Sequence, residues 1–262
     1  MSHELPIVLL SNDDGYAAEG LRALRRELQR HARVIVCAPE VNQSATSHSL
    51  SLHRVLRLRY VEHDVFSLDG TPADCVYVAL NSGERVLPRL PDLVVSGMNH
   101  GLNLSHDVFY SGTVAAAREA ALRGIPSMAV SADSAADRTC AAALAARLAM
   151  QMLDAHRRKP TRAAPLLNVN IPPGREWPVR ATTIGKRLYT QDVVYRHDPR
   201  GHEYLWIGGG TARHDHAPGS DTEAYDEGCV SITPITLDLV SSDHGELVAA
   251  TCSAVPKPAV SD

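Results

Sequence analysis

The chain has 262 residues, of which 44% are hydrophobic and 21% are charged, and its formal net charge is −4. This composition is typical of a soluble globular protein with a large core, and the acidic balance argues against a protein that coats nucleic acid. We see no secretory signal and no stretch apolar enough to span a bilayer, so we expect a cytoplasmic protein. Five widely spaced cysteines without a CxxC pair exclude a disulfide framework and a zinc ribbon: Cys37, Cys75, Cys140, Cys229 and Cys252.

The first predicted element is a short buried strand at residues 7–10, where four apolar residues stand in a row. Asp13 and Asp14 follow it directly, and a helix with leucines on one face comes next. Ligands of open α/β sheets bind at the carboxyl ends of strands, and two adjacent carboxylates there need a counter-charge such as Mg²⁺. Helix capping explains one aspartate but fits the pair less well, so the pattern favours a metal site.

A second strand is predicted at residues 33–38, which completes a strand–helix–strand unit with a right-handed crossover. The polar segment 40–49 then leaves the carboxyl end of this strand as a loop. Its hydroxyl groups are candidate oxygen ligands, phosphate donors or simple turn formers. Alternating residues between 50 and 68 predict two or three strands of an antiparallel excursion.

A helix is predicted to start at Thr71, as its N-cap, and Pro72, and to end near residue 81. The strand at 92–96 opens onto a glycine-rich loop in which Asn99 and Asn103 offer neutral oxygen ligands and amide donors. An alanine-rich helix begins after Ser111, Gly112 and Thr113. Helix N-termini bind anions, so this start is a candidate phosphate site, although an ordinary cap explains the local pattern equally well.

Residues 1–174 complete a doubly wound, Rossmann-like α/β core, with further strands at 125–131 and 166–171 and a helix at 137–153. Residues 175–228 form a separate extension, in which 189–207 is predicted to be a long hairpin that turns near 198–201. Its exposed edges and apolar residues predict oligomerisation. A strand at 229–235 returns to the core within segment 229–252, and residues 253–262 are predicted to be a flexible tail.

The loops together resemble those of the SurE family (survival protein E) of metal-dependent nucleotidases, in order and at suitable spacing. The resemblance covers roughly residues 6 to 131, and a late strand at 230–234 also fits. The motifs that carry it are Ser11-Asn12-Asp13-Asp14-Gly15-Tyr16, Ala38-Pro39 with Gln43-Ser44-Ala45-Thr46, Gly70-Thr71-Pro72-Ala73-Asp74-Cys75, Val95-Ser96-Gly97-Met98-Asn99-His100-Gly101-Leu102-Asn103 and Tyr110-Ser111-Gly112-Thr113-Val114.

The resemblance implies a Rossmann-like core with a C-terminal extension that makes homodimers or homotetramers. It also implies hydrolysis of nucleoside 5′- and 3′-monophosphates, and in some members of short-chain polyphosphate. Position by position, it implies one Mg²⁺ or Mn²⁺ per subunit, held by Asp13, Asp14, Ser44 and Asn99. The sequence departs from the family pattern at two positions where glycine is common, Ser47 and Ser105.

In the mechanism that follows, Asp13 and Asp14 are also the catalytic residues, and Asn103 joins the helix start at 111–113 in binding phosphate. Water activated by the cation or by an aspartate attacks in line, and the sequence leaves the general base open. We expect neither a membrane nor sequence-specific nucleic acid as a partner. Four histidines lie near the loops and could assist catalysis, but each is predicted to serve as polar packing or to support the site residues: His48, His53, His100 and His106.

The competing class is a non-catalytic nucleotide-binding or regulatory module on the same scaffold. The first strand is not followed by Gly-x-Gly-x-x-Gly, which weakens a dinucleotide-binding interpretation, and a Walker A sequence is absent. The Asp-x-Asp-x-Thr arrangement of haloacid-dehalogenase-type phosphatases is also absent. Phosphate release with and without a chelator discriminates the two classes.

Overall fold

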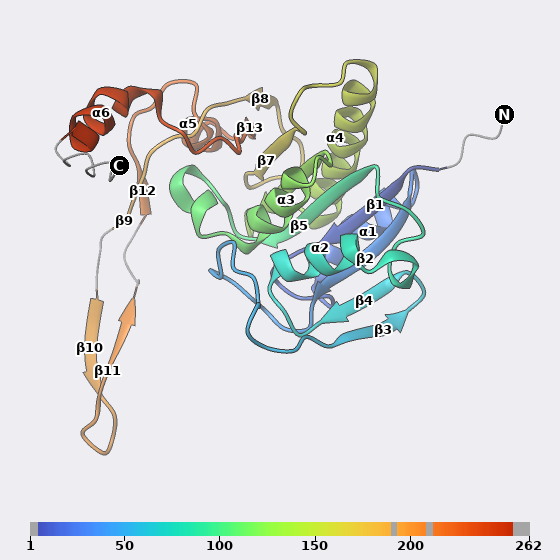
Figure 1. The fold of residues 1–262 in the computed structure, drawn as a ribbon, viewed down its shortest axis with the longest axis horizontal. Coiled ribbons are helices and arrows are strands. Elements are labelled where there is room, and N and C mark those ends of the chain that lie inside the picture. The colour runs from blue at the N-terminus through green and yellow to red at the C-terminus, as the bar shows by residue number, and fades with distance from the viewer. Residues whose placement is uncertain (1–4, 190–192, 208–211, 254–262) are drawn as a thin grey trace, which may run out of the picture.

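A mostly parallel sheet forms the centre of the computed structural model, which describes residues 5–189, 193–207 and 212–253 (Figure 1). In spatial order the strands are β3 (Leu58–Glu62), β4 (Val65–Leu68), β2 (Arg33–Pro39), β1 (Ile7–Ser11), β5 (Leu93–His100), β6 (Ser127–Ala132), β7 (Leu166–Ile171), β13 (Val230–Pro234) and β8 (Val179–Ala181). The six strands from β4 to β7 in this order run parallel to one another, whereas β3 runs antiparallel to β4, and β13 runs antiparallel to β7.

Helices cover both faces of this sheet. On one face α1 (Glu19–Leu28) and α4 (Arg138–Arg158) bury apolar side chains against alternate residues of β1, β2 and β5. On the other face α2 (Pro72–Asn81) and α3 (Gly112–Leu122) pack against the remaining residues. The predicted doubly wound, Rossmann-like fold is therefore confirmed.

The start of α2 shows how local sequence sets an element boundary. The Thr71 hydroxyl accepts a hydrogen bond from the Asp74 N–H at 3.1 Å, and the Asp74 carboxylate accepts one from the Thr71 N–H at 2.9 Å. Pro72 occupies the first helical turn, where its missing N–H costs nothing. This reciprocal capping box confirms the predicted helix start.

The excursion between β2 and α2 confirms the prediction of two or three strands, because β3 and β4 pair antiparallel there. Only β3 and β4 form strands, and residues 50–57 run over the surface without a ladder, with Leu52 77% exposed. Isolated hydrogen bonds hold this segment instead, such as that from the Ser51 N–H to the Asp74 carboxylate at 2.8 Å. The alternating segment thus forms strand only from Leu58 onward.

The segment after residue 96 differs from the prediction, because β5 continues through the first half of the expected glycine-rich loop and ends at His100. Its register against β6 shifts between Ser96 and Asn99, and the peptide bond between Gly97 and Met98 is cis. The chain then passes through a short 3₁₀ helix, η2 (Ser105–Phe109), before α3 begins. Two further 3₁₀ helices are η1 (Gly83–Arg85) and η3 (Ser242–His244).

The C-terminal part divides between the sheet and a projecting arm. β8 lies beside β13 in the main sheet, and α5 (Asp221–Asp226) packs against β13. A ladder of β9 (Arg187–Tyr189) with β12 (Ala212–His214) leads to the hairpin of β10 (Val193–His197) and β11 (Glu203–Ile207), which projects away from the body (Figure 1). The predicted hairpin and its turn are confirmed, although residues 190–192 lie outside the described residues.

The predicted return strand is confirmed as β13, and the described chain ends with α6 (Gly245–Ser253). The predicted tail lies outside the described residues from 254 onward, and the proposed segment boundaries stay predictions. Among the helices of the described ranges, none combines the length and apolar composition that crossing a bilayer would require.

Candidate active site

The predicted site residues gather where the strand order reverses. β1 pairs with β2 on one side and with β5 on the other, and the chain leaves the carboxyl end of each strand into a polar loop. In open α/β sheets this switch point leaves a crevice between loops that diverge in opposite directions. The loops at residues 12–15, 40–49 and 99–104 therefore meet at one edge of the sheet.

Asp13 is the most buried carboxylate of this edge, with 4% of its surface exposed. The Thr113 hydroxyl donates a hydrogen bond of 2.5 Å to its Oδ1, and the Asp13 carbonyl accepts one of 2.7 Å from the Gln43 N–H. Asn12 closes the loop around it by binding both the N–H and the carbonyl of Gly15. The position of Asp13 is thus fixed by its own loop, by the loop after β2 and by α3.

Burial raises the pKa of Asp13 from 3.8 to about 6. The hydrogen bond from Thr113 opposes this rise, and the negative charge of Asp14 adds to it. Among the described residues, no cationic side chain lowers the pKa of Asp13. A buried carboxylate without a counter-charge, next to a second carboxylate, fits a hard divalent cation as its missing partner.

Without a cation, Asp13 makes the folded protein less stable as the pH rises. The unfolded carboxyl releases its proton near pH 3.8 and the folded one near pH 6, so the folded state holds more protons in this window. We expect Asp13→Asn to raise the free energy of unfolding at about pH 7.5 by about 2–3 kcal/mol, and to change it little near pH 4. Thermal melts in chelator at both pH values measure this, and an equal effect at both would contradict the assigned pKa.

Asp14 and Ser44 are joined through a residue that the sequence did not single out. Asn42 donates to Asp14 Oδ1 at 3.4 Å, while its own Oδ1 accepts bonds from the Ser44 N–H at 2.8 Å and the Ser44 hydroxyl at 2.7 Å. The His100 N–H donates to Asp14 Oδ2 at 3.1 Å. The Asn42 side chain forms an Asx turn with the Ser44 N–H, two residues further on. An asparagine at this position is a recognisable sequence signal for such a turn, and that signal could have identified Asn42.

Asn99 and Asp14 line the same cleft, whose volume is about 310 Å³. The Asn99 carboxamide donates to the Gly101 carbonyl at 3.0 Å, which leaves its oxygen available as a ligand. The cleft is also lined by the start of α1, by the segment after β6 with Asp133, and by Arg138 at the start of α4. The cleft therefore opens directly beside two of the four predicted metal ligands.

The start of α3 lies against Asp13. A Cβ added at Gly112 would lie 2.9 Å from the Asp13 Cβ and 3.2 Å from Asp13 Oδ2, so only glycine lets the helix approach this closely. Ser111 caps the helix by accepting from the Val114 N–H at 3.1 Å. The Thr113 hydroxyl is bound to Asp13, so any phosphate contact from this residue has to come from its backbone.

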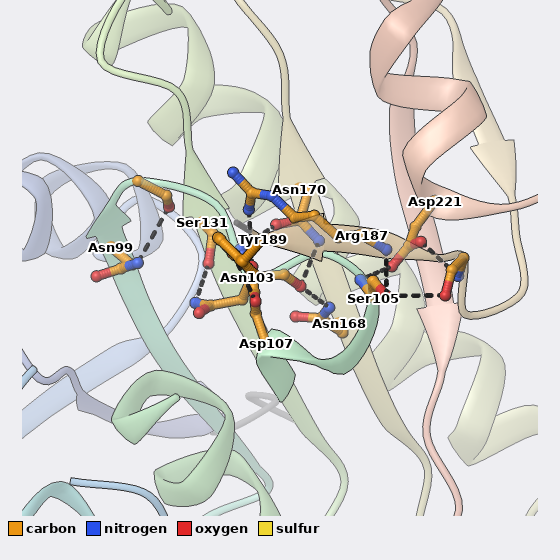
Figure 2. Close-up of polar contacts among 12 residues, drawn as sticks. Asn99, Asn103, Ser105, Asp107, Ser131, Asn168, Asn170, Arg187, Tyr189 and Asp221 are labelled. Atoms are coloured by element: carbon orange, nitrogen blue, oxygen red, sulfur yellow. Dashed lines mark hydrogen bonds and ion pairs between the residues drawn. The ribbon is translucent and has the colours of Figure 1, made fainter. Parts of the chain in front are cut away.

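Asn103 is buried like the other predicted phosphate ligands, with 7% of its surface exposed. Its side-chain nitrogen donates to the Ser131 hydroxyl at 2.7 Å, and its backbone binds two asparagines of β7, Asn168 and Asn170 (Figure 2). These β7 asparagines were missed, because a buried strand gives no local signal that its polar side chains face a distant loop.

Ser47 and Ser105, where the resemblance led us to expect glycine, both have a positive φ angle. Their φ angles are 54° and 55°, in the left-handed region that glycine adopts most easily. Each hydroxyl makes a tertiary hydrogen bond, from Ser47 to the Phe109 carbonyl at 2.6 Å and from Ser105 to the Gly185 carbonyl at 2.8 Å. The serine side chains thus tie the loop of Ser44 to η2, and η2 to the extension.

Of the predicted histidines, His48 is the one with a buried partner. Its Nε2 lies 2.9 Å from Glu119 of α3, while His53, His100 and His106 are exposed. Within the described part of the chain, no three residues among His, Cys, Asp and Glu gather as a metal cluster. A site made of two carboxylates, a hydroxyl and a carboxamide agrees with that observation, because a hard cation accepts neutral oxygen ligands.

Comparison with known proteins places this site in a family. The family model described as survival protein SurE matches residues 8–191, a range that includes every candidate site residue. The chain belongs to the SurE family. A protein named 5′-nucleotidase SurE from Sorangium cellulosum is 66% identical to it over 97% of this chain and 99% of the relative.

Further members of the SurE family agree over nearly the whole length. The 5′-nucleotidase SurE of Myxococcus xanthus is 45% identical and covers 94% of this chain and 93% of its own. The crystal structure of the SurE protein from Aquifex aeolicus superposes with a TM-score of 0.80 at 36% identity, and covers 94% of this chain and 99% of its own. The SurE fold thus includes both the sheet and most of the C-terminal extension.

Proposed function

We propose that this chain is a divalent-metal-dependent phosphomonoesterase that hydrolyses nucleoside 5′-monophosphates to nucleoside and phosphate. The proposal extends to 3′-monophosphates and to short-chain polyphosphate. The observation that carries it is the buried Asp13, which lacks a cationic partner among the described residues and lies against the start of α3. Relatives that bear the name 5′-nucleotidase SurE support it at up to 66% identity.

Asp13, Asp14, Ser44 and Asn99 would hold one Mg²⁺ or Mn²⁺. The bound cation supplies Lewis-acid stabilisation of negative charge on the phosphoryl oxygens. Two carboxylates and two neutral ligands leave the site able to attract a dianionic phosphate. Thr113 orients Asp13 through Oδ1, which leaves Oδ2 for the cation or for a proton of the attacking water.

The substrate phosphate lies between these residues and the start of α3. The first N–H groups of a helix have no intrahelical partners and bind anions, so the Gly112 and Thr113 N–H groups donate to the phosphate oxygens. The Ser111 N–H already binds the Asp107 carbonyl, so Ser111 donates through its hydroxyl. Asn103 contributes its carboxamide. The nucleoside then lies in the cleft beside Asp14 and Asn99, whose volume of about 310 Å³ suits a small ligand.

The assembly we propose is a homodimer or homotetramer formed through the C-terminal arm. Two of its large apolar side chains, Trp206 and Ile207 of β11, are 65% and 85% exposed. Exposed apolar residues on an unpaired hairpin favour a protein partner. Because nucleoside monophosphates are metabolites of the cell interior, we place the enzyme in the cytoplasm, with neither a membrane nor a sequence-specific nucleic acid as partner.

Phosphate release from a panel of substrates tests the proposed function. We expect release from 5′- and 3′-nucleoside monophosphates with Mg²⁺ or Mn²⁺, and a loss of about a hundredfold or more in excess chelator. Re-addition of metal should restore the rate. If the folded, metal-supplemented protein releases no phosphate from any substrate, the chain is a binding module and not an enzyme.

A further inference from the structure

Two asparagines lie in the middle of β7, a strand with neighbours on both sides. Asn168 and Asn170 are 0% and 1% exposed, and they share one face of the strand with Leu166, which packs against α3 and η2. A buried carboxamide in a strand interior costs free energy unless its polar atoms are hydrogen-bonded. The partners of these side chains therefore show why they are there.

Both side chains bind the backbone of one residue, Asn103 (Figure 2). The Asn103 N–H donates to Asn170 Oδ1 at 2.7 Å, and the Asn103 carbonyl accepts from Asn168 Nδ2 at 2.8 Å and from Asn170 Nδ2 at 3.2 Å. Asn103 lies between β5 and η2, outside the sheet ladder. Side chains of β7 thus form hydrogen bonds with the N–H and the carbonyl of Asn103, as the backbone of a neighbouring strand does within a sheet.

The side chain of Asn103 has one donor position left. Its Nδ2 donates to Ser131 of β6 at 2.7 Å, and a carboxamide nitrogen carries two hydrogens. Ser131 is the register partner of Asn170, so both anchors of Asn103 stand side by side on adjacent strands. With the backbone clamped on one side and one N–H bound on the other, the second N–H has a defined direction.

We propose that Asn170 and Asn168 are positioning residues for phosphate recognition: they clamp the peptide groups of Asn103 so that its free side-chain N–H donates to the substrate phosphate. This inference rests on the proposed function, in which Asn103 binds that phosphate. The clamp acts on geometry alone and touches no substrate. Because misplacement by about 1 Å costs about a hundredfold in rate, loss of the clamp should weaken catalysis strongly.

Asn170→Ala tests the clamp, with Ser231→Ala as its matched control. Ser231 is the register partner of Asn170 on β13, and its hydroxyl has no hydrogen-bond partner in the described residues. We expect Asn170→Ala to lower kcat/KM by about tenfold to a hundredfold and to weaken inorganic phosphate binding, measured calorimetrically with Mg²⁺, by about tenfold. Ser231→Ala should stay within about twofold in both measurements.

Asn168→Ala is the milder variant if Asn170→Ala does not fold, because it removes one of the two bonds to the Asn103 carbonyl. We expect it to lower phosphate affinity by about threefold to tenfold. Thermal melts establish that each variant is folded. Phosphate affinity and kcat/KM equal to wild type in the folded variants would overturn the proposal.

A double-mutant cycle separates positioning from general damage. If Asn170 acts through Asn103, Asn103→Ala and the double variant with Asn170→Ala should lose the same factor in kcat/KM and in phosphate affinity, whereas additive losses contradict the clamp. If the wild type binds phosphate in a clamp-dependent manner but hydrolyses nothing, the clamp stands and the proposed function fails. A wild type that neither binds nor releases phosphate overturns both.

Discussion

Replacing Asp13 by asparagine is expected to lower kcat/KM by about a thousandfold or more while the fold survives. The substitution removes the one buried carboxylate of the site, and an amide oxygen is a much weaker ligand for a divalent cation than a carboxylate. Its Oδ1 can still accept the hydrogen bond from Thr113, so the local geometry is retained. Steady-state phosphate release and calorimetric Mn²⁺ binding measure the effect.

Asp92→Asn is the matched control for this variant. Asp92 accepts a hydrogen bond from the Ile7 N–H at 2.8 Å at the opposite end of β1, far along the strand from Asp13. We expect it to lower thermal stability and to leave kcat/KM within about twofold. Near-normal turnover in Asp13→Asn would remove Asp13 from the metal site and would end the mechanism proposed above.

Gly112→Ala is expected to lower turnover by about tenfold to a hundredfold and to destabilise the fold by about 1–3 kcal/mol. The added methyl group would lie 2.9 Å from the Asp13 Cβ and 3.0 Å from the Pro72 Cγ, so α3 or the Asp13 loop has to move. Either movement changes the distance between the helix start and the carboxylate. Activity and thermal unfolding, measured on the same preparation, report both consequences.

The control is Gly245→Ala at the first position of α6, where an added Cβ meets no atom within 4 Å. Alanine has the higher helix propensity, so this change should leave activity unaltered and stability equal or slightly higher. If Gly112→Ala also leaves activity and stability unchanged, α3 does not approach Asp13 as closely as in the structure. The pair of variants thus tests packing at the site independently of the metal.

Local chemistry in the sequence was sufficient for most of the core. The apolar run at β1, the Thr71 and Pro72 start of α2 and the small residues at the start of α3 each specify an element through neighbours a few residues away. The strand-end rule then gathers Asp13, Asp14 and the asparagines of the β5 loop at one edge. Of the alternating segment 50–68, only residues 58–62 and 65–68 form strands, because residues 50–57 have no partner strand.

The sequence by itself therefore determined the α/β core and which loops form the site, since both depend on short-range periodicity and turn chemistry. Only the tertiary structure decided how the site residues are held. Thr113 binds Asp13 across 100 positions of the chain, and Asn170 binds Asn103 across 67. Such contacts follow from strand order and register, which no local pattern encodes, and a buried polar side chain reveals its purpose only when the packing shows its partner.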